Sequence, residues 1–136
     1  MYVVGIDRDE VLLGLACTEQ GHLPNLRFEH GDATALSFQA RFEIVTAART
    51  LQWIADPAFA IWNMKRAAKQ AGRLVVLDYN HEHNAWEPAP PPAFEAFYSA
   101  FLAWWQANGW DDEMADQSAG GFPAHRAGRR RKPRVG

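Results

Sequence analysis

Short apolar runs alternate with amphipathic stretches along the first half of the chain. Residues 2–6 form a β-branched apolar run that predicts a strand, and the spacing of apolar residues from Val11 to Ala16 predicts a helix after it. Two more short runs, at residues 26–29 and 42–47, predict a second and a third strand. Strands that alternate with helices are typical of an α/β fold with a mainly parallel sheet.

The second predicted helix has a clear start signal. Asp56 can cap its first turn, and Pro57 suits the first helical position. The apolar spacing then predicts a helix as far as Ala71 with Gly72 as its cap, followed by an almost continuously apolar strand at residues 73–78. We therefore expect about four mainly parallel strands with flanking helices.

The organisation of the chain changes after residue 86, where a proline-rich spacer begins. The spacer leads into residues 93–107, where aromatic side chains share one helical stripe. Such a stripe indicates core packing, although a ligand-binding surface or a partner surface also fits it. These changes divide the chain into a core at residues 1–86, a spacer with a helical segment at 87–117, and a basic tail at 118–136 that we expect to be disordered.

Composition narrows the classes of partner. The chain has 136 residues, 48% of them hydrophobic, and its 14 basic side chains nearly balance 16 acidic ones, which excludes a surface with general affinity for nucleic acid or anionic membrane. The local exception is the basic tail, for which a solvated segment is a better reading than phosphate binding. No apolar segment approaches the ~20 residues of a membrane span. Cys17, the single cysteine, lies in an apolar run, so we expect it in the core of a cytoplasmic protein without an internal disulfide.

Two carboxylates are placed for ligand binding. Asp7 ends the first predicted strand, and ligands of open α/β sheets bind at the carboxyl ends of the strands, where a carboxylate can accept both hydroxyls of a ribose. An N-cap role for Asp7 explains its position equally well. Asp32 follows Gly31 in the turn after the second strand, where on its own it fits an ordinary turn residue.

Titratable groups are concentrated at residues 78–84, just after the last predicted strand. His81 and His83 are candidate general bases, and a solvated polar loop is the competing interpretation. Together with Asp78 or Glu82 they could form part of a metal site, but a His-x-His pair without a distant partner motif does not specify one. We therefore expect no metal.

Four segments in register carry a family resemblance: Val4-Gly5-Ile6-Asp7, Gly31-Asp32-Ala33, residues 42–47 and residues 66–78. In their order and spacing, residues 3–117 resemble class I S-adenosylmethionine-dependent methyltransferases, particularly the small-molecule type akin to the ubiquinone and menaquinone methyltransferases. The resemblance implies a Rossmann-like sheet, S-adenosylmethionine as cofactor and methyl transfer to a small-molecule acceptor. It also implies a helical lid at the aromatic stripe.

The same resemblance implies a role for individual residues. Asp7 would hold the ribose of the cofactor, Arg8 would pack near the adenine, and Asp32 with the Ala33 amide would bind the adenine edge. Thr46, Ala47 and Arg49 would border the methionine moiety and the acceptor. The implied acceptor contacts are Trp53, Tyr79, Phe97, Tyr98 and Phe101.

The chain also departs from the family pattern, which predicts a truncated domain. The family's first strand, its glycine-rich motif and its last two strands have no counterpart here. Because that first strand lies at the centre of the family's sheet, its loss predicts two strand pairs with open inner edges. A noncatalytic module that completes its sheet with a partner chain, or an oligomer formed through the open edge, is therefore an alternative function. A nicotinamide-binding Rossmann domain is a third interpretation, and the sequence does not identify the methyl acceptor.

Overall fold

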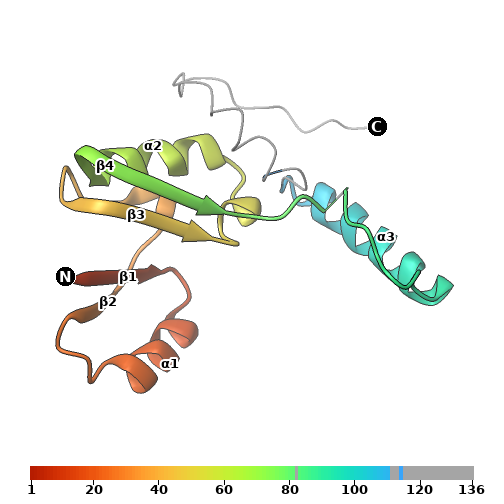
Figure 1. Cartoon of the computed structure of the whole chain (residues 1–136), viewed down its shortest axis with the longest axis horizontal. Coiled ribbons are helices and arrows are strands. Elements are labelled where there is room, and N and C mark those ends of the chain that lie inside the picture. The colour runs from red at the N-terminus through yellow and green to blue at the C-terminus, as the bar shows by residue number, and fades with distance from the viewer. Residues whose placement is uncertain (82, 111–113, 115–136) are drawn as a thin grey trace.

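The computed structural model describes residues 1–81, 83–110 and 114 (Figure 1). Strands and helices alternate as predicted, and the acidic residue Asp7 ends the first strand. The elements are β1 (Val3–Asp7), α1 (Glu10–Gln20), β2 (Leu26–His30), η1 (Ala33–Ala35), β3 (Phe42–Ala48), η2 (Leu51–Trp53), α2 (Pro57–Ala67), β4 (Ala68–Leu77) and α3 (Pro92–Ala107).

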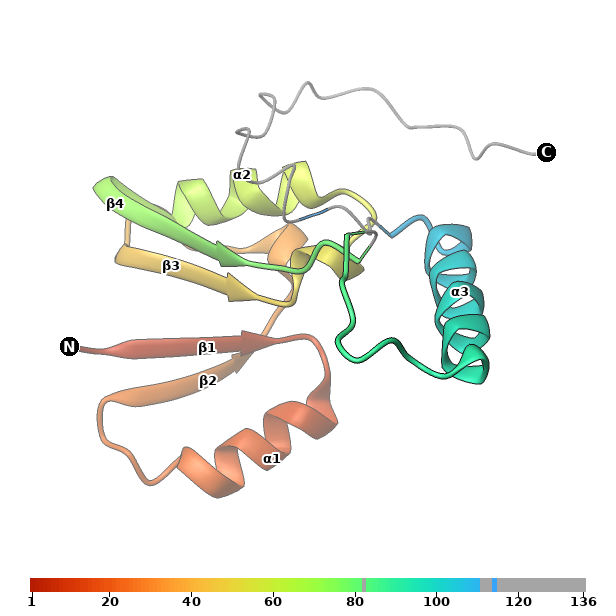
Figure 2. The same cartoon turned by 45° about the vertical axis from the view of Figure 1, so that its right-hand side comes forward.

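The four strands form two parallel pairs rather than one sheet. β1 pairs with β2, and β3 pairs with β4. Within the described residues no ladder joins β1 to β3, although these two strands run in the same direction and face each other (Figures 1 and 2). The prediction of mainly parallel strand pairs with open inner edges is confirmed.

The best-buried core lies between α2 and the β3–β4 pair. Leu51, Ala60 and Met64 are almost completely buried there, together with Met114. Apolar side chains of β3 and β4 pack against them, because alternate residues of each strand face α2. Asp56 caps α2 through a hydrogen bond from the Phe59 amide (3.0 Å), as its position before Pro57 predicted.

The segment after β2 connects the two strand pairs. Ala33 and Leu36 pack against the core of the second pair. Asn63 on α2 is only 3% exposed, and its Nδ2 donates to the carbonyl oxygens of Thr34 (3.1 Å) and Phe59 (3.0 Å). This polar contact fixes the turn that follows Asp32 against α2.

The predicted end of the second helix is wrong by four residues. α2 ends at Ala67, and residues 68–72 belong to β4 instead of completing the helix to Gly72. The amides of Ala40 and Arg41 donate to the carbonyls of Arg66 and Ala67 (2.8 Å each). The carbonyls at the end of the helix are therefore bonded by the segment before β3 and not by a further helical turn. The ladder between β3 and β4 is irregular between Phe42 and Ile44, because residues 69–72 carry the chain from the end of the helix into the regular part of β4.

α1 differs from the prediction in its burial. Cys17 is exposed rather than in the core, and Val11, Leu12 and Leu15 are 54–80% exposed. The narrow two-stranded β1–β2 pair contacts the helix but leaves none of its residues buried. Val11, Leu12 and Leu15 are therefore left largely uncovered within the described residues, while Leu13 and Ala16 are half-buried.

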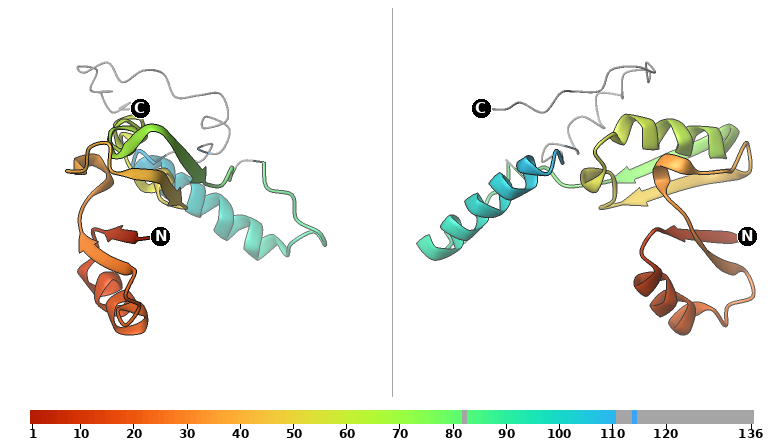
Figure 3. Two further views of the ribbon diagram at one scale, coloured as in Figure 1. Left: turned by 60° about the vertical axis from the view of Figure 1, so that its left-hand side comes forward. Right: turned by 180° about the vertical axis from the view of Figure 1, so that it is seen from behind.

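α3 extends away from both strand pairs in every view (Figure 3). It follows the predicted aromatic helix closely. Aromatic contacts help to attach it to the rest, because Trp105 is 1% exposed and packs against Trp53 with ring centroids 4.0 Å apart and the rings tilted by 41°. No helix within the described ranges is long and apolar enough to cross a membrane. The predicted basic tail at residues 118–136 lies outside the described residues.

We predict that Asn63→Ala lowers the free energy of unfolding by about 1–3 kcal/mol, because it leaves the Thr34 carbonyl without its buried donor. Urea denaturation measures this difference. Gln70→Ala, at an exposed position of β4, is the control and should change stability by less than about 0.5 kcal/mol. Equal effects of the two variants would contradict the link between the strand pairs.

Candidate functional site

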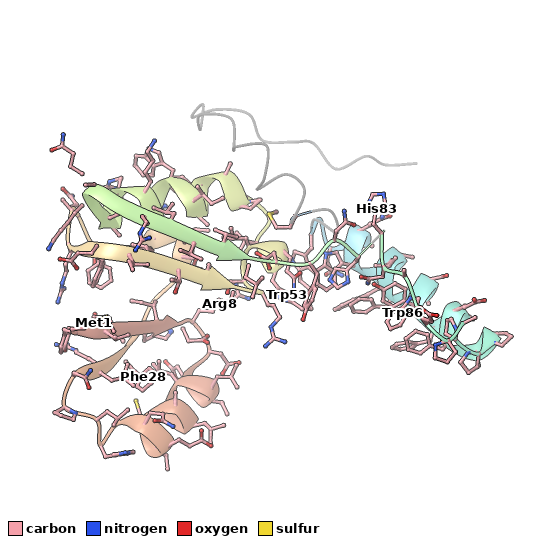
Figure 4. All side chains as sticks on the ribbon, in the orientation of Figure 1. Met1, Arg8, Phe28, Trp53, His83 and Trp86 are labelled. Carbon is pink, nitrogen blue, oxygen red and sulfur yellow. The ribbon has the colours of Figure 1, made fainter. Side chains whose placement is uncertain are left out.

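The carboxyl ends of β1 and β2 bring Asp7 and Asp32 to one edge of the structure. Asp7 pairs with His30 at the end of the ladder, and the Gly31 amide donates to the Asp7 carbonyl (3.0 Å). Asp32 follows directly, so both carboxylates leave the backbone at the same edge. Arg8 lies there too, at the end of the β1 arrow (Figure 4).

Asp32 is held as a charged acceptor. Its Oδ1 accepts hydrogen bonds from the Thr34 amide and hydroxyl (2.7 Å each), and it caps the short helix η1. These two bonds hold the pKa of Asp32 below its ordinary value, and the nearby positive charge of Arg8 adds a smaller effect in the same direction. A carboxylate in this state accepts hydrogen bonds and does not donate them.

Asp7 is half-buried and holds the turn that leads into α1. Its Oδ1 accepts from the Asp9 amide (2.9 Å), and Asp9 in turn caps α1 by accepting from Val11 and Leu12. The cap of α1 is thus Asp9, and Asp7 does not supply it. The Oδ2 of Asp7 has no hydrogen-bond partner within the described residues.

The residue types at this edge fit a nucleoside. The hydroxyls of a ribose and the exocyclic amine of an adenine are donors, and Asp7 and Asp32 present acceptors. Ala33, whose amide was expected to meet the adenine ring, follows Asp32 at the start of η1 and is half-buried. The group of Asp7, Arg8, Asp32 and Ala33 therefore has the donor and acceptor types that an adenosine moiety requires.

The second strand pair contributes its own carboxyl end. Thr46 and Ala47 lie near the carboxyl end of the strand β3. Arg49 follows the strand with φ 53°, a left-handed conformation that turns the chain sharply. Beyond that turn, the Leu51 amide donates to Oδ2 of Asp78 (3.3 Å), which follows β4. Burial raises the pKa of Asp78 above its ordinary value, although the backbone amides of η2 partly oppose the effect.

The loop after β4 meets α3 in an aromatic cluster. The ring of His81 lies 4.9 Å from that of Trp105, and its Nδ1 is 3.0 Å from the Tyr98 hydroxyl. Beside this pair is a hollow of about 290 Å³, lined by Tyr79, His81, Asn84, Ala85, Trp86 and Tyr98. An adjoining hollow of about 260 Å³ shares Trp86 and Tyr98, so the two form one groove along the start of α3.

The predicted acceptor contacts are only partly brought together. Tyr79 and Tyr98 line the groove, and Phe101 packs on His81 with ring centroids 6.1 Å apart. Trp53 reaches the cluster through Trp105. Phe97 is 64% exposed and lines neither hollow.

The two candidate bases lie in different surroundings. His81 is half-buried among aromatic rings, whereas His83 is exposed and its Nδ1 lies 2.8 Å from Asn80 Nδ2 (Figure 4). Asn84 and Trp86 are groove residues that the sequence analysis did not single out. In the sequence, the one indication of a role for these residues was their position within or just after the polar run of residues 78–84.

A search of the described part of the chain finds no group of three or more His, Cys, Asp or Glu side chains placed to hold a metal ion.

Alternating strands and helices, with acceptors at the carboxyl ends of parallel strands, define the class of open α/β folds, which bind their ligands at this edge. The family described as Methyltransferase domain matches residues 1–76, and the chain belongs to this family. The recognition made from the four sequence segments is confirmed.

Two curated relatives illustrate the likeness. The 2-phytyl-1,4-naphtoquinone methyltransferase of Thermosynechococcus vestitus is 29% identical over 104 residues, which are 76% of this chain and 43% of the relative. The demethylmenaquinone methyltransferase of Deinococcus radiodurans is 33% identical over 106 residues, 76% of this chain and 40% of the relative. The chain thus spans less than half the length of these relatives.

Solved structures share the fold. A candidate methyltransferase from Bacillus halodurans is similar with a TM-score of 0.54 and 29% identity, over 72% of this chain and 41% of that one. The YcgJ protein of Bacillus subtilis has a TM-score of 0.54 at 21% identity, over 85% of this chain and 65% of that one, which is a likeness of fold alone. The predicted Rossmann-like methyltransferase fold is confirmed.

The acid stability of the domain should report on Asp32. Because its folded pKa is lowered, the ionised carboxylate contributes stability above its unfolded pKa of about 3.9, and this contribution is lost as the pH falls through the folded pKa. Thr34→Val removes one of the two bonds, so the stability difference from the wild type should be largest near neutral pH and shrink below about pH 4.

Urea unfolding between pH 3 and pH 7 measures this difference. Thr18→Val is the matched control, because the Thr18 hydroxyl bonds the Gly14 carbonyl and no carboxylate. A Thr34→Val effect that does not change with pH would contradict the assigned state of Asp32.

Proposed function

We propose that this chain is the nucleoside-binding part of an S-adenosylmethionine-dependent methyltransferase that acts on a small-molecule acceptor. The observation that carries the proposal is the position of Asp7 and Asp32 at one strand edge, in a chain of the methyltransferase family. Because the chain spans less than half the length of the relatives reported above, methyl transfer by the whole protein is part of this proposal.

Asp7 would accept from the ribose hydroxyls through its open Oδ2, while Oδ1 keeps the α1 turn in place. Asp32 and the Ala33 amide would take the adenine edge, and Arg8 would border the base. Thr46, Ala47 and Arg49, at the carboxyl end of β3, would border the methionine moiety. When bound, the cofactor supplies an activated methyl group on sulfur.

The aromatic groove beside α3 is the proposed acceptor site. Tyr79, Trp86 and Tyr98 offer flat faces, and His81 and Asn84 offer polar atoms at the same hollow. Flat walls with a few polar groups suit a small aromatic ring. The relatives reported above are named for a 2-phytyl-1,4-naphthoquinone and for demethylmenaquinone. Trp53 and Phe101 would support the walls of this site.

In the proposed reaction the chain positions the acceptor and removes its proton. His81 is the proposed general base, because it lines the groove while His83 is exposed and directed to Asn80. Its ring nitrogen would take the proton of an acceptor hydroxyl or activated carbon as the new bond to the methyl carbon forms and the bond from that carbon to sulfur breaks, with the electron pair left on sulfur. Most of the rate would come from proximity and orientation of the two reactants. A cytoplasmic location, with an exposed reduced Cys17, belongs to the same proposal.

Isothermal titration with S-adenosylmethionine tests the cofactor part. We expect saturable binding by the wild type, and a roughly ten- to hundredfold weaker affinity for Asp7→Asn, because the amide replaces a charged acceptor. Asp9→Asn is the matched control: it removes the same charge two residues away, and asparagine still caps α1.

Saturable binding with a selective loss in Asp7→Asn supports the proposal. An affinity that falls equally in both variants would assign the effect to net charge alone. A folded wild type without saturable binding would leave only the family membership.

A second candidate function follows from the open strand edges: a noncatalytic module that accepts one extended strand of a second polypeptide chain between β1 and β3. Both edges have backbone groups without a ladder partner in the described residues, and the two strands run the same way. One inserted strand parallel to both would pair with each edge, as in strand addition. The exposed apolar residues of α1 would gain cover from the same chain.

Light scattering separates the two candidates. The module reading predicts an obligate oligomer or a co-purifying partner that dissociates only with loss of folded structure. A monodisperse, cooperatively melting monomer would contradict it.

A further inference from the structure

The Tyr98 hydroxyl is the centre of a polar network at the edge of the aromatic groove. It lies 3.2 Å from the His81 carbonyl oxygen, 3.0 Å from His81 Nδ1 and 2.6 Å from Asn84 Nδ2. All three distances are within hydrogen-bond range. One hydroxyl therefore contacts both the backbone and the ring of the same histidine.

The number of protons that each group carries determines which groups donate the hydrogen bonds of this network. Tyr98 has a single hydroxyl proton, and a carbonyl oxygen can only accept, so that proton is donated to the His81 carbonyl. The remaining contacts must then be donated to the Tyr98 oxygen. Asn84 Nδ2 carries protons and supplies one of these bonds. The other requires a proton on Nδ1 of His81.

A neutral imidazole carries one proton, and its position determines which nitrogen is basic. A proton on Nδ1 leaves the lone pair on Nε2. We propose that Tyr98 is a positioning residue that holds His81 in the tautomer protonated at Nδ1, so that Nε2 is the proton-accepting atom. The catalytic meaning of this tautomer rests on the proposed function, in which His81 is the general base.

Asn84 has a supporting part in the same network. By donating to Tyr98, it fills one acceptor position of the phenolic oxygen and leaves the other for Nδ1. The aromatic neighbours Phe94 and Phe101 hold the Tyr98 ring independently of its hydroxyl. Removal of the hydroxyl should therefore change the histidine proton without unpacking the ring.

Long-range proton–nitrogen correlation spectra of ¹⁵N-labelled protein distinguish the two tautomers directly. At about pH 8.5, well above the ordinary histidine pKa of about 6.5, we expect His81 to show a protonated Nδ1 and an unprotonated Nε2. Loss of the signals in His81→Gln assigns them. In Tyr98→Phe we expect the Nδ1-protonated form to fall below half of the population.

Tyr79→Phe is the matched control, because Tyr79 is also close to His81, with ring centroids 5.6 Å apart, but its hydroxyl is not part of the network. This variant should leave the tautomer unchanged. A purely structural role for Tyr98 would alter the melting temperature of Tyr98→Phe without moving the proton.

A wild type protonated at Nε2, or an unchanged tautomer in a folded Tyr98→Phe, would overturn the proposal. The wild-type spectrum decides even if the variant does not fold. The spectra require neither cofactor nor acceptor, so their result is independent of the titration with S-adenosylmethionine. Failure of that titration would remove the proposed function and leave the positioning of His81 by Tyr98 intact.

Discussion

The arrangement of the candidate site depends on the attachment of the segment after β2 to α2. Asn63 donates to the Thr34 carbonyl, and Ala33 and Leu36 pack on the core of the second strand pair. No ladder joins β1 to β3 in the described residues, so this attachment carries much of the relation between the two pairs. It places η1, which Asp32 caps, and β3 against one common element, α2.

The aromatic half of the site depends on a different set of contacts. Packing of Trp105 against Trp53 joins α3 to the segment after β3, and the bonds between Tyr98 and His81 join α3 to the loop after β4. Large aromatic faces gain most of their free energy from burial, whereas the polar bonds fix one orientation. The groove therefore combines a broad apolar surface with one oriented histidine.

The sequence predicted the features that local pattern controls. Apolar runs located β1, β2 and β3 within one residue at each end, whereas β4 begins at Ala68, five residues before the predicted strand. The rule that parallel strands end at one edge brought Asp7 and Asp32 together. The end of α2 was not predictable in this way. Residues 68–71 favour a helix locally, and the break comes from bonds to Ala40 and Arg41, which are distant in sequence.

The sequence did not predict the exposure of Cys17 or the network around Tyr98, for a related reason. An apolar helix face predicts burial only if another element covers it, and the narrow β1–β2 pair does not. The bonds between His81, Asn84 and Tyr98 join side chains separated by as many as 17 positions. Periodicity carries no information on such contacts, because they depend on how the loop meets α3.

The central claim is that the carboxyl edge of the strands forms an adenosine-binding surface. Amide chemical-shift mapping with S-adenosylhomocysteine tests it most directly. We expect saturable chemical-shift changes at the amides of residues 7–9, 31–34 and 46–49. Shifts confined to α1 or to the outer end of α3, or no saturable shift in a folded sample, would contradict it.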